Sequence, residues 1–145
     1  MPFVYRLQKV LEFRIRAKEQ QLLVVQKAQQ DVYLQEEKIR QNEAEIRQTI
    51  QNKRTADFRM MEYYDNYLHH LWDKADALEQ ERRRLQAILD EEQKKLVKLE
   101  QVVKVVEKHK EKQFSEIGVQ RFFIHSREEA EEQELQEQLR KLESE

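Results

Sequence analysis

The chain has 145 residues, 39% of them charged and 39% hydrophobic, with one glycine, one proline and no cysteine. This composition is typical of coiled coils and long helices and argues against a wide globular core. The net charge of −2 provides no general field that would attract nucleic acid. The longest apolar run is too short to cross a bilayer, and the absence of cysteine fits a reducing compartment.

The first expected element is a helix over about residues 3–52. Pro2 suits its beginning, because the missing N–H costs nothing in a first helical turn. Residues at seven-residue spacing predict a coiled-coil seam along this helix. The main series is Val4, Leu11, Lys18, Val25, Val32, Ile39, Ile46 and Lys53. The companion series, weaker in its middle, is Gln8, Ile15, Leu22, Gln29, Glu36, Glu43 and Ile50.

We expect the chain to turn near residues 52–57, with residues 53–57 forming the tip between the two helices. Asn52 can end the first helix in left-handed geometry, and Thr55 can cap the second helix with Asp57 in its first turn. The fold class predicted is therefore all-α, a long antiparallel two-helix coiled-coil hairpin. One unbroken helix that pairs with a second chain is the alternative, since nothing in the turn forbids a helix.

The second arm is expected over about residues 58–117, again with two seven-residue series. One is Tyr64, Leu71, Leu78, Leu85, Glu92, Leu99 and Val106, and the other is Met61, Leu68, Ala75, Arg82, Leu89, Leu96 and Val103. A hairpin centred on Thr55 pairs residues whose numbers add to about 110 or 111. This register places Lys18 opposite Glu92, so that two charges on the seam face each other.

Residues 107–145 have no expected partner in the hairpin. Gly118 marks a possible break, and Ser126 with Glu129 forms a capping-box pattern that restarts an acidic helix over about 127–143. That helix carries leucines on one face and forms a C-terminal extension to the single domain. The apolar residues of this segment are a cluster after the break, Val119, Phe122, Phe123 and Ile124, and the leucines of the helix, Leu135, Leu139 and Leu142.

Little in the chain suggests chemistry. One glycine cannot build a phosphate-binding loop, and no nucleophile motif is present, so we expect no enzyme activity and no cofactor. Asp65, His69 and Asp73 share a helical face but offer too few metal ligands, so a solvated face is the favoured interpretation and no metal is expected. The basic run Arg82–Arg84 lies among glutamates, which favours a solvated helix over nucleic-acid binding.

Aromatic residues gather just after the predicted turn. Tyr64, Leu68 and Leu71 belong to the seam, but the others exceed what one seam can cover. Exposed aromatic clusters are frequent binding anchors, so we expect a partner surface here. Its candidate residues are Phe58, Tyr63, Tyr67, His70 and Trp72.

The opening sequence, Phe3-x-Tyr5-Arg6-Leu7-Gln8-Lys9-Val10-Leu11-Glu12, resembles the amino-terminal signature of the bacterial flagellar export protein FliJ family. The pattern Phe58…Tyr67-Leu68-x-x-Leu71 and the total length are similar as well. One departure is the C-terminal segment, which has Glu128–Glu134 without the Asp-Glu pair of that family. The resemblance implies a stalk-like antiparallel coiled coil in the soluble, cytoplasmic part of the type III export apparatus, peripherally associated with the inner membrane.

The resemblance also implies partners. The paired termini would bind the hexameric export ATPase FliI and promote its assembly, the turn would contact the export gate protein FlhA, and the protein would escort export chaperones. By position, the ATPase would be faced by Phe3, Tyr5, Arg6, Leu7, Lys9, Val10, Leu11 and Arg14. The equivalent stalk of a virulence secretion system and a generic dimeric coiled-coil scaffold remain as alternatives.

Overall fold

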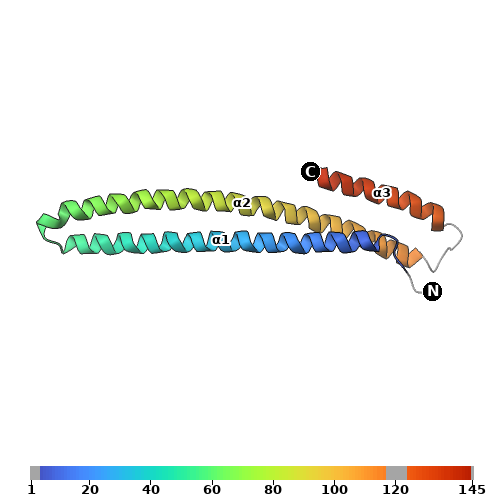
Figure 1. The fold of residues 1–145 in the computed structure, drawn as a ribbon, viewed down its shortest axis with the longest axis horizontal. Coiled ribbons are helices and arrows are strands. Elements are labelled where there is room, and N and C mark those ends of the chain that lie inside the picture. Colours follow the sequence, from blue (N-terminus) through green and yellow to red (C-terminus); the bar gives the residue numbers. More distant parts are fainter. Residues whose placement is uncertain (1–3, 117–123, 145) are drawn as a thin grey trace. The chain divides into compact units, whose positions relative to one another are not determined.

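A computed structural model describes residues 4–116 and 124–144, and the side chains of 124–127 are outside that description. The described chain is helical. Helix α1 spans Gln8–Arg54, a short 3-10 helix η1 spans Phe58–Met60, α2 spans Met61–Glu116 and α3 spans Ile124–Ser144 (Figure 1). No proline or glycine interrupts the sequence between Pro2 and Gly118, which allows helices of this length.

The chain divides into two compact units. The terminal unit comprises Met1–Val24 with Glu92–Glu145, and the turn unit comprises Val25–Glu91. Helices α1 and α2 contribute to both. Each unit is described separately below.

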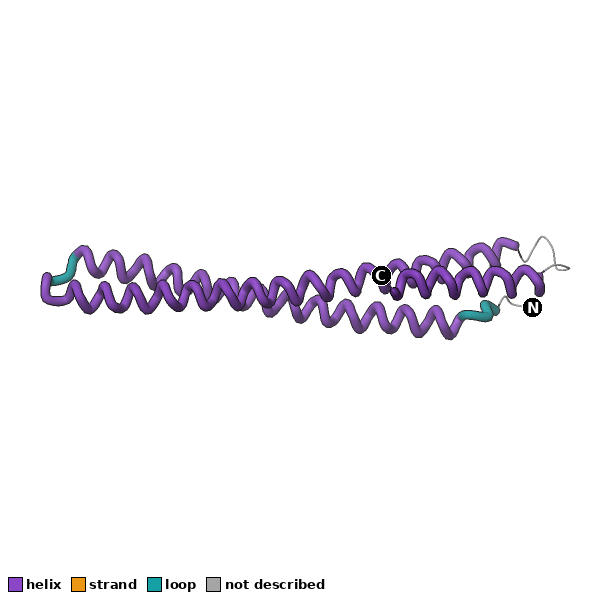
Figure 2. Tube along the Cα trace, turned by 90° about the horizontal axis from the view of Figure 1, so that it is seen from above, coloured by secondary structure: helices purple, strands orange, loops and turns teal. Residues whose placement is uncertain are grey.

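In the turn unit α1 and α2 pack side by side in antiparallel directions, which confirms the predicted hairpin (Figure 2). Val25 and Val32 of the main series of α1 are buried, as are Leu68 and Leu71 of α2. A single chain therefore buries its own seam, because the turn folds α2 back onto α1. One unbroken helix, the alternative that the sequence leaves open, would have no such turn.

The companion stripe of α1 lies one residue earlier than predicted. Residues Gln35, Asn42 and Thr49 are buried at seven-residue spacing, whereas Glu43 of the predicted series is exposed. The polar side chains of the true stripe find partners across the seam or within α1. Gln35 donates to the Leu78 carbonyl at 3.0 Å. A search for apolar periodicity could not identify this stripe, because its members are polar.

The register differs from the prediction by two to three residues. Asn42 donates to the Leu71 carbonyl at 3.1 Å, so the paired residue numbers add to 113, as they do for Gln35 and Leu78. The sequence predicts that Lys18 and Glu92 lie opposite each other, but in the terminal unit Glu92 makes another contact. Glu92 accepts hydrogen bonds from Gln21 and from Lys95. A neutral amide therefore takes the place that we expected a lysine to fill.

The turn is built without a left-handed residue. Helix α1 continues past Asn52 to Arg54, and no positive φ occurs in the described parts of the chain. The Ala56 N–H instead donates to the Lys53 carbonyl at 3.2 Å. This hydrogen bond between residues three apart is of the 3-10 type, and it satisfies one of the last carbonyls of α1. Thr55 donates its hydroxyl back to Asn52 rather than capping the second arm, which begins as η1 after Asp57.

The amino-terminal boundary is also later than expected. Helix α1 begins at Gln8 rather than near residue 3, with the Gln8 N–H bonded to the Tyr5 carbonyl at 3.1 Å. The side chain of Tyr5 is buried in the core of the terminal unit. The turn at residues 5–8 therefore allows Tyr5 to reach that core before the helix starts.

Helix α3 packs in the terminal unit, contrary to the expectation that residues 107–145 lack a partner. Leu135 and Leu139 are buried in one apolar cluster with residues of the amino-terminal segment, α1 and α2. That cluster also contains Tyr5, Leu11, Val102, Val103 and Val106. The helix begins at Ile124, before the expected residue 127. The proposed break at Gly118 and the apolar residues 119, 122 and 123 lie outside the described residues.

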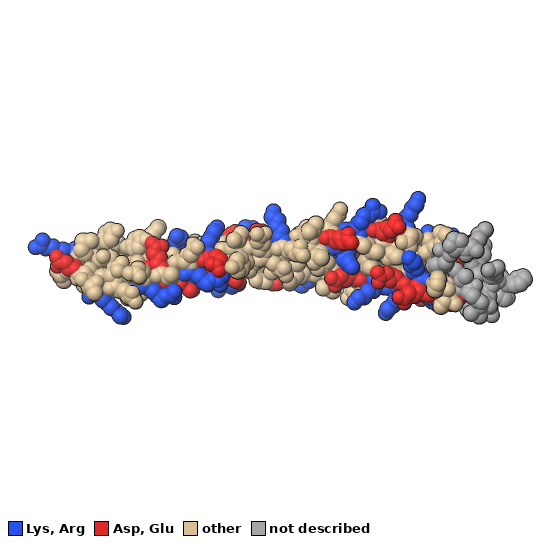
Figure 3. Space-filling view, turned by 90° about the horizontal axis from the view of Figure 1, so that it is seen from below, with Lys and Arg blue, Asp and Glu red and all other residues tan. Residues whose placement is uncertain are grey.

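Charges of both signs are interspersed over the described surface drawn in Figure 3. The basic run Arg82–Arg84 follows this pattern, because Arg82 pairs with Glu79 and Arg84 with Glu81. Hydrogen bonds from these arginines lower the pKa of both glutamates. None of the helices in the described parts of the chain contains an apolar stretch that could span a lipid bilayer.

Candidate partner-binding surfaces

The amino-terminal candidate residues do not share one exposed face. Tyr5 and Leu11 are buried in the apolar cluster of the terminal unit, and Leu7 packs against it. Val10 and Arg14 are half-buried, whereas Arg6 and Lys9 are exposed. Phe3 lies outside the described residues. The structure thus divides this set into core residues, such as Tyr5 and Leu11, and charged residues that are exposed to solvent, such as Arg6 and Lys9.

Tyr5 is held by His109 of α2. Its hydroxyl forms a short hydrogen bond with His109 Nδ1, and the rings lie 5.5 Å apart at their centroids. Burial, with a smaller contribution from the carboxylates of Glu132 and Glu131, raises the pKa of Tyr5 to about 12. The neutral phenol therefore donates to Nδ1, and in neutral His109 this places the ring proton on Nε2.

The other side of His109 faces α3. Its Nε2 lies 3.7 Å from Glu131, an ion-pair distance that is too long for a hydrogen bond. Glu131 also pairs with Lys112 at 3.2 Å, and this contact raises the pKa of Lys112. Tyr5, His109 and Glu131 consequently connect the amino-terminal segment, α2 and α3 through one chain of polar contacts.

Two arginines of the candidate set are engaged by α3. Arg6 lies 3.4 Å from Glu128 and 3.2 Å from Glu132, and Arg14 pairs with Glu143. The order of these pairs shows that α3 runs parallel to α1 within the terminal unit. The side chain of Arg6 is still 48% exposed, so its ion pairs remain open to solvent and to competing ligands.

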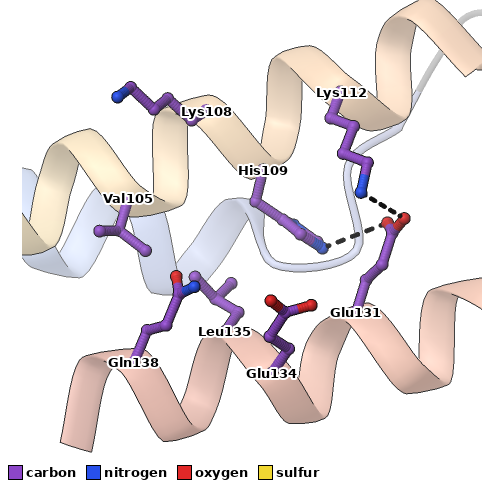
Figure 4. A pocket seen from close by; sticks show the side chains of 8 residues that line it. All are labelled: Val105, Lys108, His109, Lys112, Glu131, Glu134, Leu135 and Gln138. Atoms are coloured by element: carbon purple, nitrogen blue, oxygen red, sulfur yellow. Dashed lines mark ion pairs between the residues drawn. The ribbon is translucent and has the colours of Figure 1, made fainter. Parts of the chain in front are cut away.

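An open-sided pocket of about 380 Å³ lies between α2 and α3 (Figure 4). His109, Lys112 and Glu131 border it in the close-up. Its remaining lining residues are Val105, Lys108, Glu134, Leu135 and Gln138. The side chains of the two helices therefore leave unfilled space beside the buried leucines.

In the turn unit, the aromatic candidates divide between two faces of α2. The rings of Tyr63 and Tyr67 are parallel, with their centroids 6.5 Å apart. The centroid of the Tyr67 ring lies 6.4 Å from that of His70. Trp72 lies about two and a half helical turns beyond Tyr63 and so points to the opposite side. There its ring meets His69 edge-on at 5.3 Å.

Phe58 belongs to the second of these faces. It is 86% exposed in η1 and, with His69, borders a shallow pocket of about 570 Å³. The pocket is completed by Arg59, Met61, Glu62, Asp65 and Asn66. We call Tyr63, Tyr67 and His70 the tyrosine face, and Phe58, His69 and Trp72 the tryptophan face.

Tyr67 differs from its neighbours because it also stabilises the hairpin. It is half-buried, and its hydroxyl donates to Glu45 of α1, which raises the pKa of Tyr67. Asp65, considered above with His69 and Asp73, forms an ion pair with Lys53. The described residues contain no group of three or more potential ligands arranged to hold a metal ion.

Several residues of these surfaces were not anticipated from the sequence. His109 and Glu131 lie 22 positions apart on different helices, and no local pattern links them. The sequence pattern suggests His69 only as a metal ligand. A histidine with a tryptophan three positions later is a helical neighbour pair, and this spacing could have placed His69 on the tryptophan face.

Comparisons of this chain with models of protein families, with curated proteins and with solved structures found no match.

Proposed function

We propose that this chain is a coiled-coil stalk protein of a type III protein export apparatus, of the flagellar FliJ kind. In this role it binds the hexameric export ATPase FliI and promotes its activity, contacts the export gate protein FlhA and escorts export chaperones. It acts in the cytoplasm, at the inner face of the inner membrane. It is not an enzyme itself.

One observation carries the proposal: the opening sequence from Phe3 to Glu12, which resembles this family, precedes and begins an antiparallel helical hairpin. An antiparallel helical hairpin alone is common among helical proteins. The combination of the opening sequence with the hairpin suits a protein that presents its paired terminal segments to one partner and its turn to another.

The terminal unit is the proposed contact for the ATPase. Arg6 and Lys9 present positive charge at its surface, while Tyr5 and Leu11 hold the segment in place from inside. Exposed charges at an interface chiefly govern association rate and salt dependence. We therefore assign Arg6 and Lys9 to recognition, and Tyr5 and Leu11 to positioning.

The test is ATP turnover by FliI with increasing amounts of this protein. Turnover should rise, and Lys9→Glu should shift the half-maximal concentration upward. Lys27→Glu, an exposed charge reversal in the turn unit, is the matched control and should leave the curve unchanged. Unaltered turnover at saturating protein would remove the ATPase from the proposal.

The turn unit is the proposed contact for the gate, and its two aromatic faces can be tested separately. Tyr63→Ala with His70→Ala removes exposed rings of the tyrosine face, and Phe58→Ala with Trp72→Ala does so for the tryptophan face. Tyr67 is left intact because of its bond to Glu45. A face that contains the binding hot spot should lose about thirty-fold in affinity for FlhA.

Tyr33→Ala provides the control for the gate experiment, since this exposed aromatic residue lies on α1 away from both faces. Equal affinity of both double variants and the wild type would exclude the turn as the gate contact. The generic dimeric scaffold is disfavoured by the intramolecular hairpin, whereas the virulence-type stalk shares the same fold and would be distinguished by which ATPase responds.

A further inference from the structure

The face of the terminal unit beneath α3 has an apolar floor formed by three segments of the chain. Val102, Val103 and Val106 of α2 are almost completely buried there, together with Tyr5 and Leu11. Helix α3 covers this floor with leucines at i, i+4 and i+7, the spacing by which an amphipathic helix fills a groove. These leucines are Leu135, Leu139 and Leu142.

Basic groups surround the floor and meet carboxylates of α3. Arg6 pairs with Glu128 and Glu132, and Lys112 pairs with Glu131. Arg14 pairs with Glu143 beyond the last leucine. The groove therefore selects an acidic helix, with carboxylates placed one to two turns before the first leucine and directly after the last.

The fit of α3 in this groove is incomplete. On the groove side, Arg14 Nε and His109 Nε2 are buried without a hydrogen-bond partner among the described atoms. The pocket of about 380 Å³ beside Leu135 leaves further space unfilled (Figure 4). Buried polar atoms without partners favour exchange for a ligand that satisfies them.

We propose that this groove is a binding site for an acidic amphipathic helix of another protein, and that α3 is its intramolecular competitor. The ligand carries the pattern Glu-x-x-Glu-Glu-x-x-Leu-x-x-x-Leu-x-x-Leu-Glu that α3 shows from Glu128 to Glu143. A partner helix of this kind displaces α3 and takes its ion pairs. The inference goes beyond the proposed function and does not require the export ATPase.

The test uses the full-length chain and a labelled peptide of residues 124–144 as the probe. In the variant Leu135→Asp with Leu139→Asp, the resident helix can no longer fill the groove. The peptide should bind this variant about tenfold more tightly than the wild type, because a tethered helix competes at a high effective concentration. Fluorescence anisotropy measures both affinities, and circular dichroism checks that the variant stays helical.

Matched controls separate the leucines from added charge. Gln133→Asp with Gln136→Asp introduces the same two charges at exposed positions of α3, so this variant should bind the peptide as weakly as the wild type does. A peptide with Asp at 135 and 139 should not bind. Arg6→Glu in the opened variant should weaken binding, and a peptide with Glu128→Arg and Glu132→Arg should restore it.

Hydrogen exchange of the wild-type chain provides a second measurement that needs no variant. Amides of Leu135 and Leu139 should exchange faster than those of Val102 and Val106, because α3 detaches while α2 stays folded. Equal protection of both helices would overturn the proposal, as would an opened variant that is helical but binds no peptide. A mass that doubles with concentration would assign the groove to α3 of a second copy instead.

Discussion

At the scale of single residues, the pair of Tyr5 and His109 shows how a distant contact positions the amino terminus. Their side chains bind each other although 104 positions separate them, and both are buried. The periodicity of the sequence identifies neither residue as a core position. The family resemblance marks Tyr5 as a residue for partner contact, and only the folded chain places its side chain in the core.

Replacing Tyr5 with Phe should destabilise the protein by about 1–3 kcal/mol, because His109 Nδ1 would be buried without its donor. The urea midpoint of unfolding measures this loss. Tyr33→Phe, at an exposed position, should change the free energy of unfolding by no more than about 0.5 kcal/mol.

The same pair makes a pH prediction. Because the pKa of Tyr5 is raised from 10.0 to about 12, its stabilising contribution is complete below pH 10 and is lost as the pH rises to about 12. The stability difference between wild type and Tyr5→Phe should shrink over that interval. A constant difference would contradict a neutral buried phenol.

Gln21 and Glu92 form a second informative contact. Gln21 donates to the Glu92 carboxylate at 2.6 Å, and this hydrogen bond, followed by that of Lys95, lowers the pKa of Glu92. The contact therefore stabilises the folded state above the ordinary pKa of a glutamate, and its contribution is lost as the pH falls through the lowered value. Gln21→Leu should raise the pKa of Glu92, measured by NMR titration of the carboxyl carbon.

Gln20→Leu is the control for that titration, since Gln20 is exposed and adjacent in sequence. It should leave the Glu92 titration unchanged. If both variants shift the titration equally, the cause is general hydrophobicity rather than the hydrogen bond.

At the scale of elements, the polar stripe of α1 in the turn unit distinguishes this hairpin from an ideal coiled coil. Asn42 is buried, and its amide donates to a backbone carbonyl of α2 while its own oxygen has no partner among the described atoms. A buried asparagine of this kind lowers stability and selects one register of the seam.

Asn42→Leu should therefore raise the free energy of unfolding by about 1 kcal/mol, since an imperfectly satisfied polar group is replaced by an apolar one. It should also relax the register, which crosslinking between cysteines introduced into α1 and α2 would report as additional pairs. Asn52→Leu, at an exposed position of α1, serves as the control and should alter neither property. A less stable Asn42→Leu protein would show that the hydrogen bond to Leu71 outweighs the unpaired oxygen.

At the scale of the whole molecule, the apolar stripes of α1 and α2 are buried within a single chain. We expect a monomer of 17.9 kDa in light scattering, at concentrations where a dimeric coiled coil would show twice that mass. Glu36→Lys, outside the seam stripes that the structure shows, should leave the mass unchanged. A dimer that persists on dilution would favour the unbroken-helix scaffold over the stalk, whereas a mass that doubles only with concentration indicates exchange of α3.

The sequence by itself determined the helices and favoured an antiparallel pairing, which only the folded chain distinguished from one unbroken helix. Both stripes of α2 and the main stripe of α1 follow from apolar residues at seven-residue spacing, which is a local property of the chain. The position of the turn could be predicted to within a few residues because the seven-residue series of the two arms end there, although Asn52 and Thr55 do not cap the helices as predicted.

Only the tertiary structure decided the register, the polar stripe and the place of α3. The sequence pattern assigns the polar Gln35 and Asn42 to the surface, but in the folded chain each donates to a backbone carbonyl of α2. The sequence likewise indicates no partner for Leu135, which packs in one cluster with Val102 and Val106. Such contacts depend on which distant groups meet in space. Periodicity within one helix reports a buried face but not what covers it.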